Sequence, residues 1–176
     1  WAFYQQFPES ENAARALNNS AVYYSQEGQR QRGMETRRVI VDNFEDSEFF
    51  EDHLALLGYD HEVIADFEES ANLYERLFEI NDEHEKAAGA IYTAAKFRQA
   101  MGDWEGAITN YRAYMEAYPN ATEPSTALMP LDIARLLESN GQWSDASREF
   151  YEFYSQQNTE GITPDQLMYA RLHYAK

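Results

Sequence analysis

The sequence lacks cysteine and has little proline, glycine or lysine. Its 176 residues include five Pro, eight Gly and three Lys among 14 basic residues. Without cysteine the chain can hold no disulfide, no thiol nucleophile and no thiolate-ligated zinc. Sparse Pro and Gly disfavour a turn-rich β-sandwich. No apolar run approaches the ~18 residues that a membrane-spanning helix needs, so we expect no direct membrane insertion.

Acidic residues dominate what is present. There are 31 Asp and Glu against 14 Lys and Arg, which gives a net charge of −17. An acidic protein of this kind repels a phosphate backbone, so we expect no nucleic-acid partner. The hydrophobic fraction of 44% and aromatic fraction of 15% exceed those of a disordered chain and supply a core.

The chain repeats itself. The stretches 102–114 and 141–153 align without a gap, and each has Gly, an aromatic two residues later, Ala and two further aromatics. The spacing places these side chains on one helical stripe. Two earlier stretches carry fainter copies. The four stripes are Met34, Arg37, Val41, Phe44; Phe67, Ser70, Tyr74, Leu77; Trp104, Ala107, Tyr111, Tyr114; and Trp143, Ala146, Phe150, Phe153.

Each stripe is preceded by another predicted helix, the first of its pair, which carries a large residue followed by a small one. These pairs are Tyr24-Ser25, Leu57-Gly58, Ala94-Ala95 and Ile133-Ala134. The small residue allows close helix packing, and neighbouring pairs must stack to bury their stripes. We expect Trp104 and Trp143 in the core. Because Arg37 takes a slot that normally holds a small residue, we expect the first copy of the repeat to pack loosely or to face solvent. The predicted helices are 11–28, 32–46, 48–63, 65–81, 84–101, 104–118, 125–139, 143–157 and 163–175, with Pro130 either starting or kinking its helix.

These residues resemble a tetratricopeptide-repeat (TPR) array, and the string from Gly102 to Pro119 is similar to the family's second-helix signature. The resemblance implies an all-α fold of antiparallel helix-pair repeats stacked into a right-handed TPR-like α-solenoid. We expect a single array over 1–176, a fragment of a longer protein. Its parts are the end of a preceding repeat (1–10), the helix pairs 11–46, 48–82, 84–119 and 124–157, and the first helix of a further repeat (163–176).

The resemblance also implies a function, a non-catalytic scaffold that binds partner proteins or peptides on the concave face formed by first helices. The linker 118–124 resembles those of envelope-associated bacterial TPR proteins. We therefore expect a multi-protein envelope assembly, such as outer-membrane biogenesis or gliding motility, and a periplasmic or envelope location, with the cytoplasm as the alternative. A regulatory TPR array of a larger enzyme or signalling protein is the alternative function. The expected partner-binding residues are Tyr23, Gln26, Arg30, Tyr59, Glu62, Tyr92, Lys96, Gln99, Arg135 and Glu138.

Some known chemistry of the family does not carry over. Its chaperone-binding members hold a carboxylate with Lys, Asn and Arg, but the matching slots here are Val22, Gln26, Leu56, Gly89 and Thr93. The acidic segment 42–52 is interpreted as a solvated helix junction rather than a docking patch for a basic partner. The arginines Arg30, Arg32, Arg37 and Arg38 are expected to pair within the chain rather than with an acidic peptide.

Catalysis and metal binding find little support in the sequence. Acids are numerous, but no pair stands out as an acid–base pair. His53 and His61 lie two helical turns apart with acids beside them, so a metal site is conceivable. The repeat, however, places His61 where a TPR packs an aromatic side chain, and a packing role is preferred. We therefore expect no catalytic residue, no metal and no cofactor.

Overall fold

The computed structural model describes residues 1–156 and 161–174. Over these residues the chain is helical, with an isolated bridge between Thr122 and Ser125 and no longer strand. The chain divides into two compact units, Trp1–Ala90 and Ile91–Lys176. The predicted all-α fold of helix-pair repeats is confirmed.

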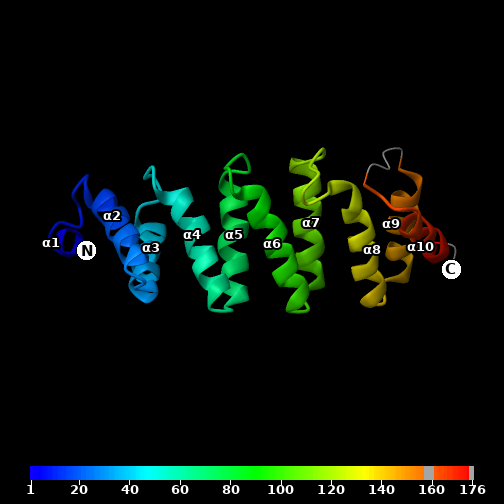
Figure 1. Ribbon diagram of the computed structural model, residues 1–176, viewed down its shortest axis with the longest axis horizontal. Coiled ribbons are helices and arrows are strands. Elements are labelled where there is room, and N and C mark those ends of the chain that lie inside the picture. Colours follow the sequence, from blue (N-terminus) through cyan, green and yellow to red (C-terminus); the bar gives the residue numbers. More distant parts are fainter. Residues whose placement is uncertain (157–160, 175–176) are drawn as a thin grey trace. The chain divides into compact units, whose positions relative to one another are not determined.

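Unit 1 is built from α1 to α5 and the first turn of α6, and unit 2 from the rest of α6 to α10 (Figure 1). Within unit 1, α2 packs on α3, α3 on α4 and α4 on α5. Within unit 2, α7 packs on α8, α8 on α9 and α9 on α10. The elements are α1 Ala2–Gln6, α2 Ala13–Gln26, α3 Arg30–Asn43, α4 Phe50–Val63, α5 Phe67–Ile80, α6 Ala87–Ala100, α7 Trp104–Ala117, the 3-10 turn η1 Thr126–Leu128, α8 Met129–Ser139, α9 Trp143–Ser155 and α10 Pro164–Tyr174.

Each predicted helix has a counterpart, but several begin two or three residues late because the linkers between pairs form turns. In the linker before α4, Ser47 donates its N–H to the Phe44 carbonyl, and Phe50 donates to that of Ser47. The linkers before α2 and α6 make the same two bonds at positions shifted by 37 residues. The predicted helix ends at 157 and 175 lie outside the described residues, and the predicted division into repeats stays a prediction.

Within each pair, the turn between helices needs a left-handed residue. Gly28, Gly102 and Gly141 have φ of 68°, 82° and 75°, and Ala65 has φ of 61° at the same place in the second pair. At each of these turns two N–H groups cap the preceding helix. For example, Ala65 donates to the Glu62 carbonyl, and this is half of the Schellman pattern that favours glycine. Among these four turns, the one at Ala65 is therefore the strained copy.

We expect Ala65→Gly to stabilise the protein. A left-handed alanine costs about 1–2 kcal/mol, and the added chain entropy of glycine offsets part of the gain, so the net increase in unfolding free energy is up to about 1 kcal/mol. Gly102→Ala should lose a similar amount, because a Cβ there meets no atom within 4 Å and only the backbone is strained. Urea unfolding of both variants measures the effects. A destabilised Ala65→Gly protein would contradict this account.

Most stripe residues of the second helices lie in the core, as predicted, but Phe67 at the start of α5 is 37% exposed. Tyr111, Tyr114, Phe150 and Phe153 are each 0–1% exposed. Around them, small residues permit the close packing. At Gly58 a Cβ would lie 2.5 Å from the Tyr74 ring, so only glycine fits there.

The prediction that Trp143 is a core residue is wrong, since 66% of it is exposed. One turn further along α9, Ser147 is half-buried and donates its hydroxyl to the Tyr174 carbonyl at 2.9 Å. Trp104 is half-buried.

Pro130 starts its helix rather than kinking it. The turn η1 leads directly into α8, and Pro130 occupies the first turn of that helix, where no intrahelical N–H bond is lost. The preceding linker is held by Thr126, which donates its hydroxyl to the Tyr118 carbonyl at 2.7 Å. Tyr114 donates its hydroxyl to the Pro124 carbonyl at 3.0 Å.

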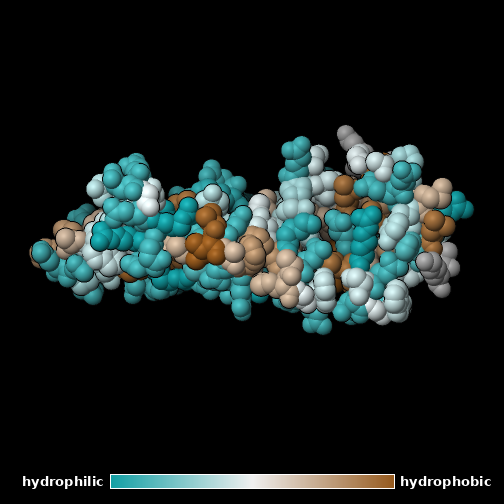
Figure 2. Space-filling model, turned by 60° about the horizontal axis from the view of Figure 1, so that its bottom comes forward, coloured by the Kyte–Doolittle hydropathy of each residue, from teal (hydrophilic) through white to brown (hydrophobic). Residues whose placement is uncertain are grey.

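The face drawn in Figure 2 is mostly hydrophilic, with apolar side chains gathered in a few patches. None of the described helices is long and apolar enough to cross a membrane.

Candidate partner-binding surface

The ten predicted binding residues divide equally between the units. They all lie on the first helices of the pairs (α2, α4, α6 and α8), apart from Arg30, which begins α3. The exposed members are Tyr23, Gln26, Arg30, Tyr59, Lys96 and Arg135; the half-buried members are Glu62, Tyr92, Gln99 and Glu138. Partner binding by any of them stays a prediction.

Two of the half-buried residues are hydrogen-bonded to the second helix of their own pair. Glu62 accepts a hydrogen bond from the Tyr74 hydroxyl at 3.0 Å, and Gln99 accepts one from the Tyr111 hydroxyl at 3.1 Å. In both cases the partners are 12 residues apart. Burial raises the pKa of both tyrosines, so these hydroxyls stay protonated donors.

Glu138 has the same position in its pair but different partners. Phe150 stands where the second and third pairs have a tyrosine, and it has no hydroxyl to donate. The Glu138 carboxylate instead meets His173 Nδ1 at 2.6 Å and the Tyr169 hydroxyl at 3.4 Å, both on α10. The Tyr169 ring stacks on His173 at 4.1 Å, and Arg135 lies 4.9 Å from the centre of the same ring. This cluster ties α10 to α8.

Unit 1 has a cavity of about 250 Å³ with Asp60 in its wall, which we call the Asp60 cavity. The exposed residues Arg30 and Tyr59, which sequence analysis selected, lie on its wall together with Asp60, which it did not select. The lining residues are Ser25, Gly28, Arg30, Arg37, Leu56, Tyr59 and Asp60.

The expectation that the first copy packs loosely or faces solvent because of Arg37 is wrong. The Arg37 side chain is 8% exposed, and Nη1 lies 2.5 Å from Asp60 Oδ2. Its Nη2 donates to the Ser25 hydroxyl at 2.6 Å. Gly33 leaves room for the guanidinium, since a Cβ there would lie 3.1 Å from Nη1. The buried carboxylate of α4 explains why a long cation occupies a slot where the other pairs have Ser or Ala.

The carboxyl of Asp60 is shared between two cations. Arg30 Nη1 lies 3.3 Å from Asp60 Oδ1, and its side chain is 46% exposed. Burial raises the pKa of Asp60, and the positive charges of Arg37 and Arg30 oppose that shift.

The nearby His53 is also buried, with Nε2 3.0 Å from Asn18 Oδ1. Desolvation by burial, reinforced by Arg37, lowers the pKa of His53 to about 4, so this side chain is neutral at pH 7.

Unit 2 has a similar arrangement around Asp132, which we call the Asp132 cluster: Tyr92, Lys96, Asp132 and Arg135. Burial raises the pKa of Asp132, while the charges of Lys96 and Arg135 oppose the shift. Arg135 Nη1 lies 3.7 Å from Asp132 Oδ1, and Lys96 Nζ lies 5.8 Å from the centre of the Tyr92 ring. Sequence analysis found both cations but missed both aspartates, because nothing in their spacing distinguishes them from 29 other acids.

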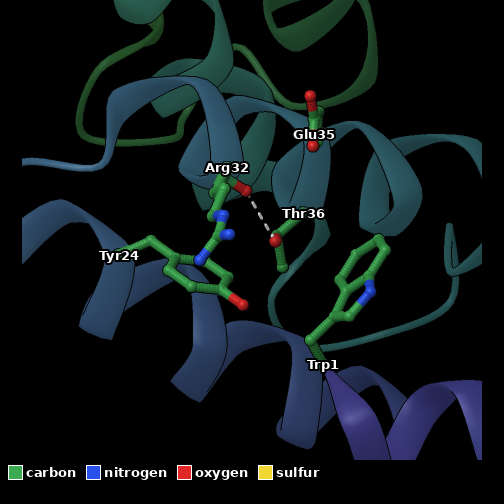
Figure 3. Close-up of a pocket in the computed structure, with 5 residues that line it drawn as sticks. All are labelled: Trp1, Tyr24, Arg32, Glu35 and Thr36. Atoms are coloured by element: carbon green, nitrogen blue, oxygen red, sulfur yellow. Dashed lines mark hydrogen bonds between the residues drawn. The ribbon is translucent and has the colours of Figure 1, made fainter.

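A second cavity in unit 1, of about 270 Å³, contains none of the predicted residues. Trp1 and Tyr24 face it from opposite sides, with Thr36 between them (Figure 3). Thr36 donates its hydroxyl to the Arg32 carbonyl at 2.7 Å, and the Arg32 guanidinium lies 5.8 Å from the centre of the Tyr24 ring. The cavity lies apart from the Asp60 carboxylate and shares no lining residue with the Asp60 cavity.

Three arginines of the basic cluster pair with acids within the chain, as predicted, whereas Arg32 donates to Gln29 Oε1 at 3.0 Å. Arg30 and Arg37 bind Asp60, and Arg38 Nη2 lies 2.6 Å from Glu69 Oε1. The acidic segment 42–52 is likewise partnered by bases from other elements. Its ion pairs are Glu45 with Arg76, Glu48 with Arg15, and Asp52 with His84 and Lys86.

His61 packs between polar groups rather than beside a candidate metal. Its Nδ1 lies 2.9 Å from Asp66 Oδ2, and its Nε2 lies 3.1 Å from Arg38 Nη2. The side chain is 13% exposed. Across residues 1–156 and 161–174, no group of three or more His, Asp or Glu side chains is arranged to hold a metal ion.

Comparisons with known proteins place the fold. No protein-family model and no curated protein sequence matches the chain. Solved structures do. A MamA protein aligns over 94% of this chain and 85% of its own, with TM-score 0.60 and 10% identity. A tetratricopeptide-repeat protein from Parabacteroides merdae aligns over 99% and 64%, with TM-score 0.56 and 15% identity.

A third structure is described as nearly identical TPR-like repeats of a kinesin light chain from Podosopora anserina. It aligns over 95% of this chain and 86% of its own, with TM-score 0.54 and 18% identity. At these sequence identities the structural alignments support the fold and no more specific property. Since the aligned structures are TPR proteins and the helix pairs agree with the sequence signature, the chain has the tetratricopeptide-repeat fold.

Proposed function

We propose that this chain is a non-catalytic scaffold that binds segments of partner proteins on the faces of its first helices. Stacked helix pairs present such faces for extended or helical segments. The observation that carries the proposal is the placement of exposed side chains beside an aspartate of a first helix: Arg30 and Tyr59 lie beside the buried Asp60 of α4, and Lys96 and Arg135 beside the half-buried Asp132 of α8. Side chains that are exposed yet oriented by a charged neighbour are suited to recognition.

The surrounding charge supports a polar, selective contact rather than an apolar one. In a chain of net charge −17, the Asp60 cavity and the Asp132 cluster each contain two cations and one carboxylate. They are therefore locally positive on an acidic protein, and complementary charge contributes mainly to specificity and to the rate of association.

We further propose that the assembly belongs to a bacterial envelope, with a periplasmic location. Its support is the resemblance of the linker 118–124, with Tyr118, Pro119 and Pro124, to linkers of envelope-associated TPR proteins. Fractionation of native cells tests it, and recovery of the full-length protein in the cytosol alone would contradict it.

The scaffold proposal is tested by affinity capture with the full-length protein from its native cell, followed by rebinding of the purified partner. The double variant Lys96→Glu, Arg135→Glu should bind that partner at least ~10-fold more weakly, because it reverses both cations of the Asp132 cluster. Arg148→Glu with Arg171→Glu is the control, since it changes net charge equally at exposed positions on α9 and α10.

Circular dichroism must show that both double variants remain folded, because Arg135 also contacts Tyr169. Equal affinity of the two double variants would contradict binding at the first-helix face of unit 2.

A further inference from the structure

The Asp60 cavity holds one more cation than its carboxylate needs. Arg37 makes the shorter contact to Asp60, 2.5 Å against 3.3 Å for Arg30. Arg37 is also fixed by Ser25 and buried, with a buried Nε that has no partner. A guanidinium so enclosed cannot leave its carboxylate without a large desolvation penalty. Arg37 therefore neutralises Asp60, and Arg30 is the surplus charge.

Arg30 is able to turn to a ligand. Its side chain is 46% exposed, and its one contact to Asp60 is at the long end of the hydrogen-bond range. Because Arg37 remains on Asp60, moving Arg30 a short way leaves no buried charge unpaired. The exchange of a long contact for a close ion pair with a new carboxylate is then favourable.

The shape of the cavity suits a single side chain. Its volume of about 250 Å³ lies below the ~300–1,000 Å³ of ordinary small-molecule sites. Leu56 and the exposed Tyr59 supply apolar surface, and Gly28 adds no side chain. A short methylene stem would pack on Leu56 and Tyr59 while its carboxylate reached Arg30. One surplus positive charge matches one carboxylate rather than a doubly charged phosphate.

We infer that the Asp60 cavity binds the side chain of a glutamate within a partner protein, with Arg30 as its counter-ion and Tyr59 packed on its stem. This inference rests on the proposed function and names the chemistry that the first-helix face of unit 1 recognises. It differs from capture of a chain terminus, because Arg30 offers one surplus charge to a side chain that enters between α3 and α4.

The test is an NMR titration of the full chain with three probes. The first is the blocked peptide acetyl-Ser-Leu-Glu-Leu-Ser-amide, and the second has Gln in place of Glu. The third is the Gln peptide with a free C-terminal carboxylate. The Glu peptide should shift the Arg30 Nε–H and Tyr59 amide signals and bind ~10-fold more tightly than the blocked Gln peptide.

Two variants sharpen the test. Arg30→Gln should remove the preference for the Glu peptide, whereas Arg32→Gln, an exposed arginine of the same helix that lines the other cavity, should keep it. Equal response to the blocked Glu and Gln peptides, or a preference that survives Arg30→Gln, overturns the inference. A stronger response to the free C-terminus than to Glu also overturns it, in favour of terminal capture.

Failure here is distinguishable from failure of the scaffold proposal. If the purified natural partner binds the first-helix faces equally well in the wild type and in Arg30→Gln, the glutamate site is wrong while the scaffold stands.

Discussion

Truncating Phe153 to alanine is expected to destabilise unit 2 by about 3–5 kcal/mol, the range measured for buried aromatic side chains. Phe153 is 0% exposed and lies in the α9 stripe. Removing its ring leaves a hole between α8 and α9 that neighbouring side chains cannot fill without leaving their rotamers. The change should appear as a lower urea midpoint of the helical circular dichroism signal.

Trp143→Ala is the matched control, because it removes a larger aromatic from the same helix. With 66% of Trp143 exposed, the loss should stay within about 0.5 kcal/mol. Equal losses in the two variants would mean that the stripe of α9 is not the core of unit 2. The comparison thus separates position in the repeat from actual burial.

Replacing Asp60 by alanine is expected to cost about 3–5 kcal/mol, although Asp60 is a polar residue. The change leaves the Arg37 guanidinium buried without its carboxylate, and an unpaired buried charge is strongly destabilising. Arg37 cannot reach solvent easily, since 8% of its side chain is exposed. Urea unfolding of Asp60→Ala against wild type measures the loss.

Two further variants identify the cause. In Arg37→Met with Asp60→Leu no buried charge remains, so stability should recover to within about 1–2 kcal/mol of wild type. Arg30→Ala should cost at most about 1 kcal/mol, because Arg30 is half-exposed and solvent screens its pair with Asp60. A double variant as unstable as Asp60→Ala would show that lost packing, rather than an unpaired charge, explains the effect.

The sequence alone predicts the helices and most of the core. Stripes at helical spacing locate Tyr111, Tyr114, Phe150 and Phe153, because burial of an amphipathic face follows from periodicity. Periodicity says nothing of where a long side chain ends. Arg37 occupies a recognisable slot, yet its guanidinium meets a carboxylate 23 residues away, and only the packing of α3 against α4 brings the two together.

The candidate surface is predictable in part for a related reason. Alignment of the repeats predicts Arg30 and Tyr59 as residues of the binding surface, but the choice of Asp60 among the acids depends on its burial, which the alignment does not give. Trp143 shows the opposite failure. Its slot in the repeat predicts a covered side chain, yet 66% of Trp143 is exposed, because a slot in the repeat does not by itself place a neighbouring side chain over it.

Glu138 shows how one missing hydroxyl can change the partner of a side chain in an array of similar helix pairs. In the second and third pairs a tyrosine hydroxyl donates to the polar side chain of the first helix, so this side chain is hydrogen-bonded within its own pair. In the fourth pair Phe150 has no hydroxyl, and the Glu138 carboxylate instead contacts His173 and Tyr169 of α10. The presence or absence of a tyrosine hydroxyl at this position therefore accompanies a different partner for the polar side chain of the first helix, which lies in the same pair in two copies and on α10 in the fourth.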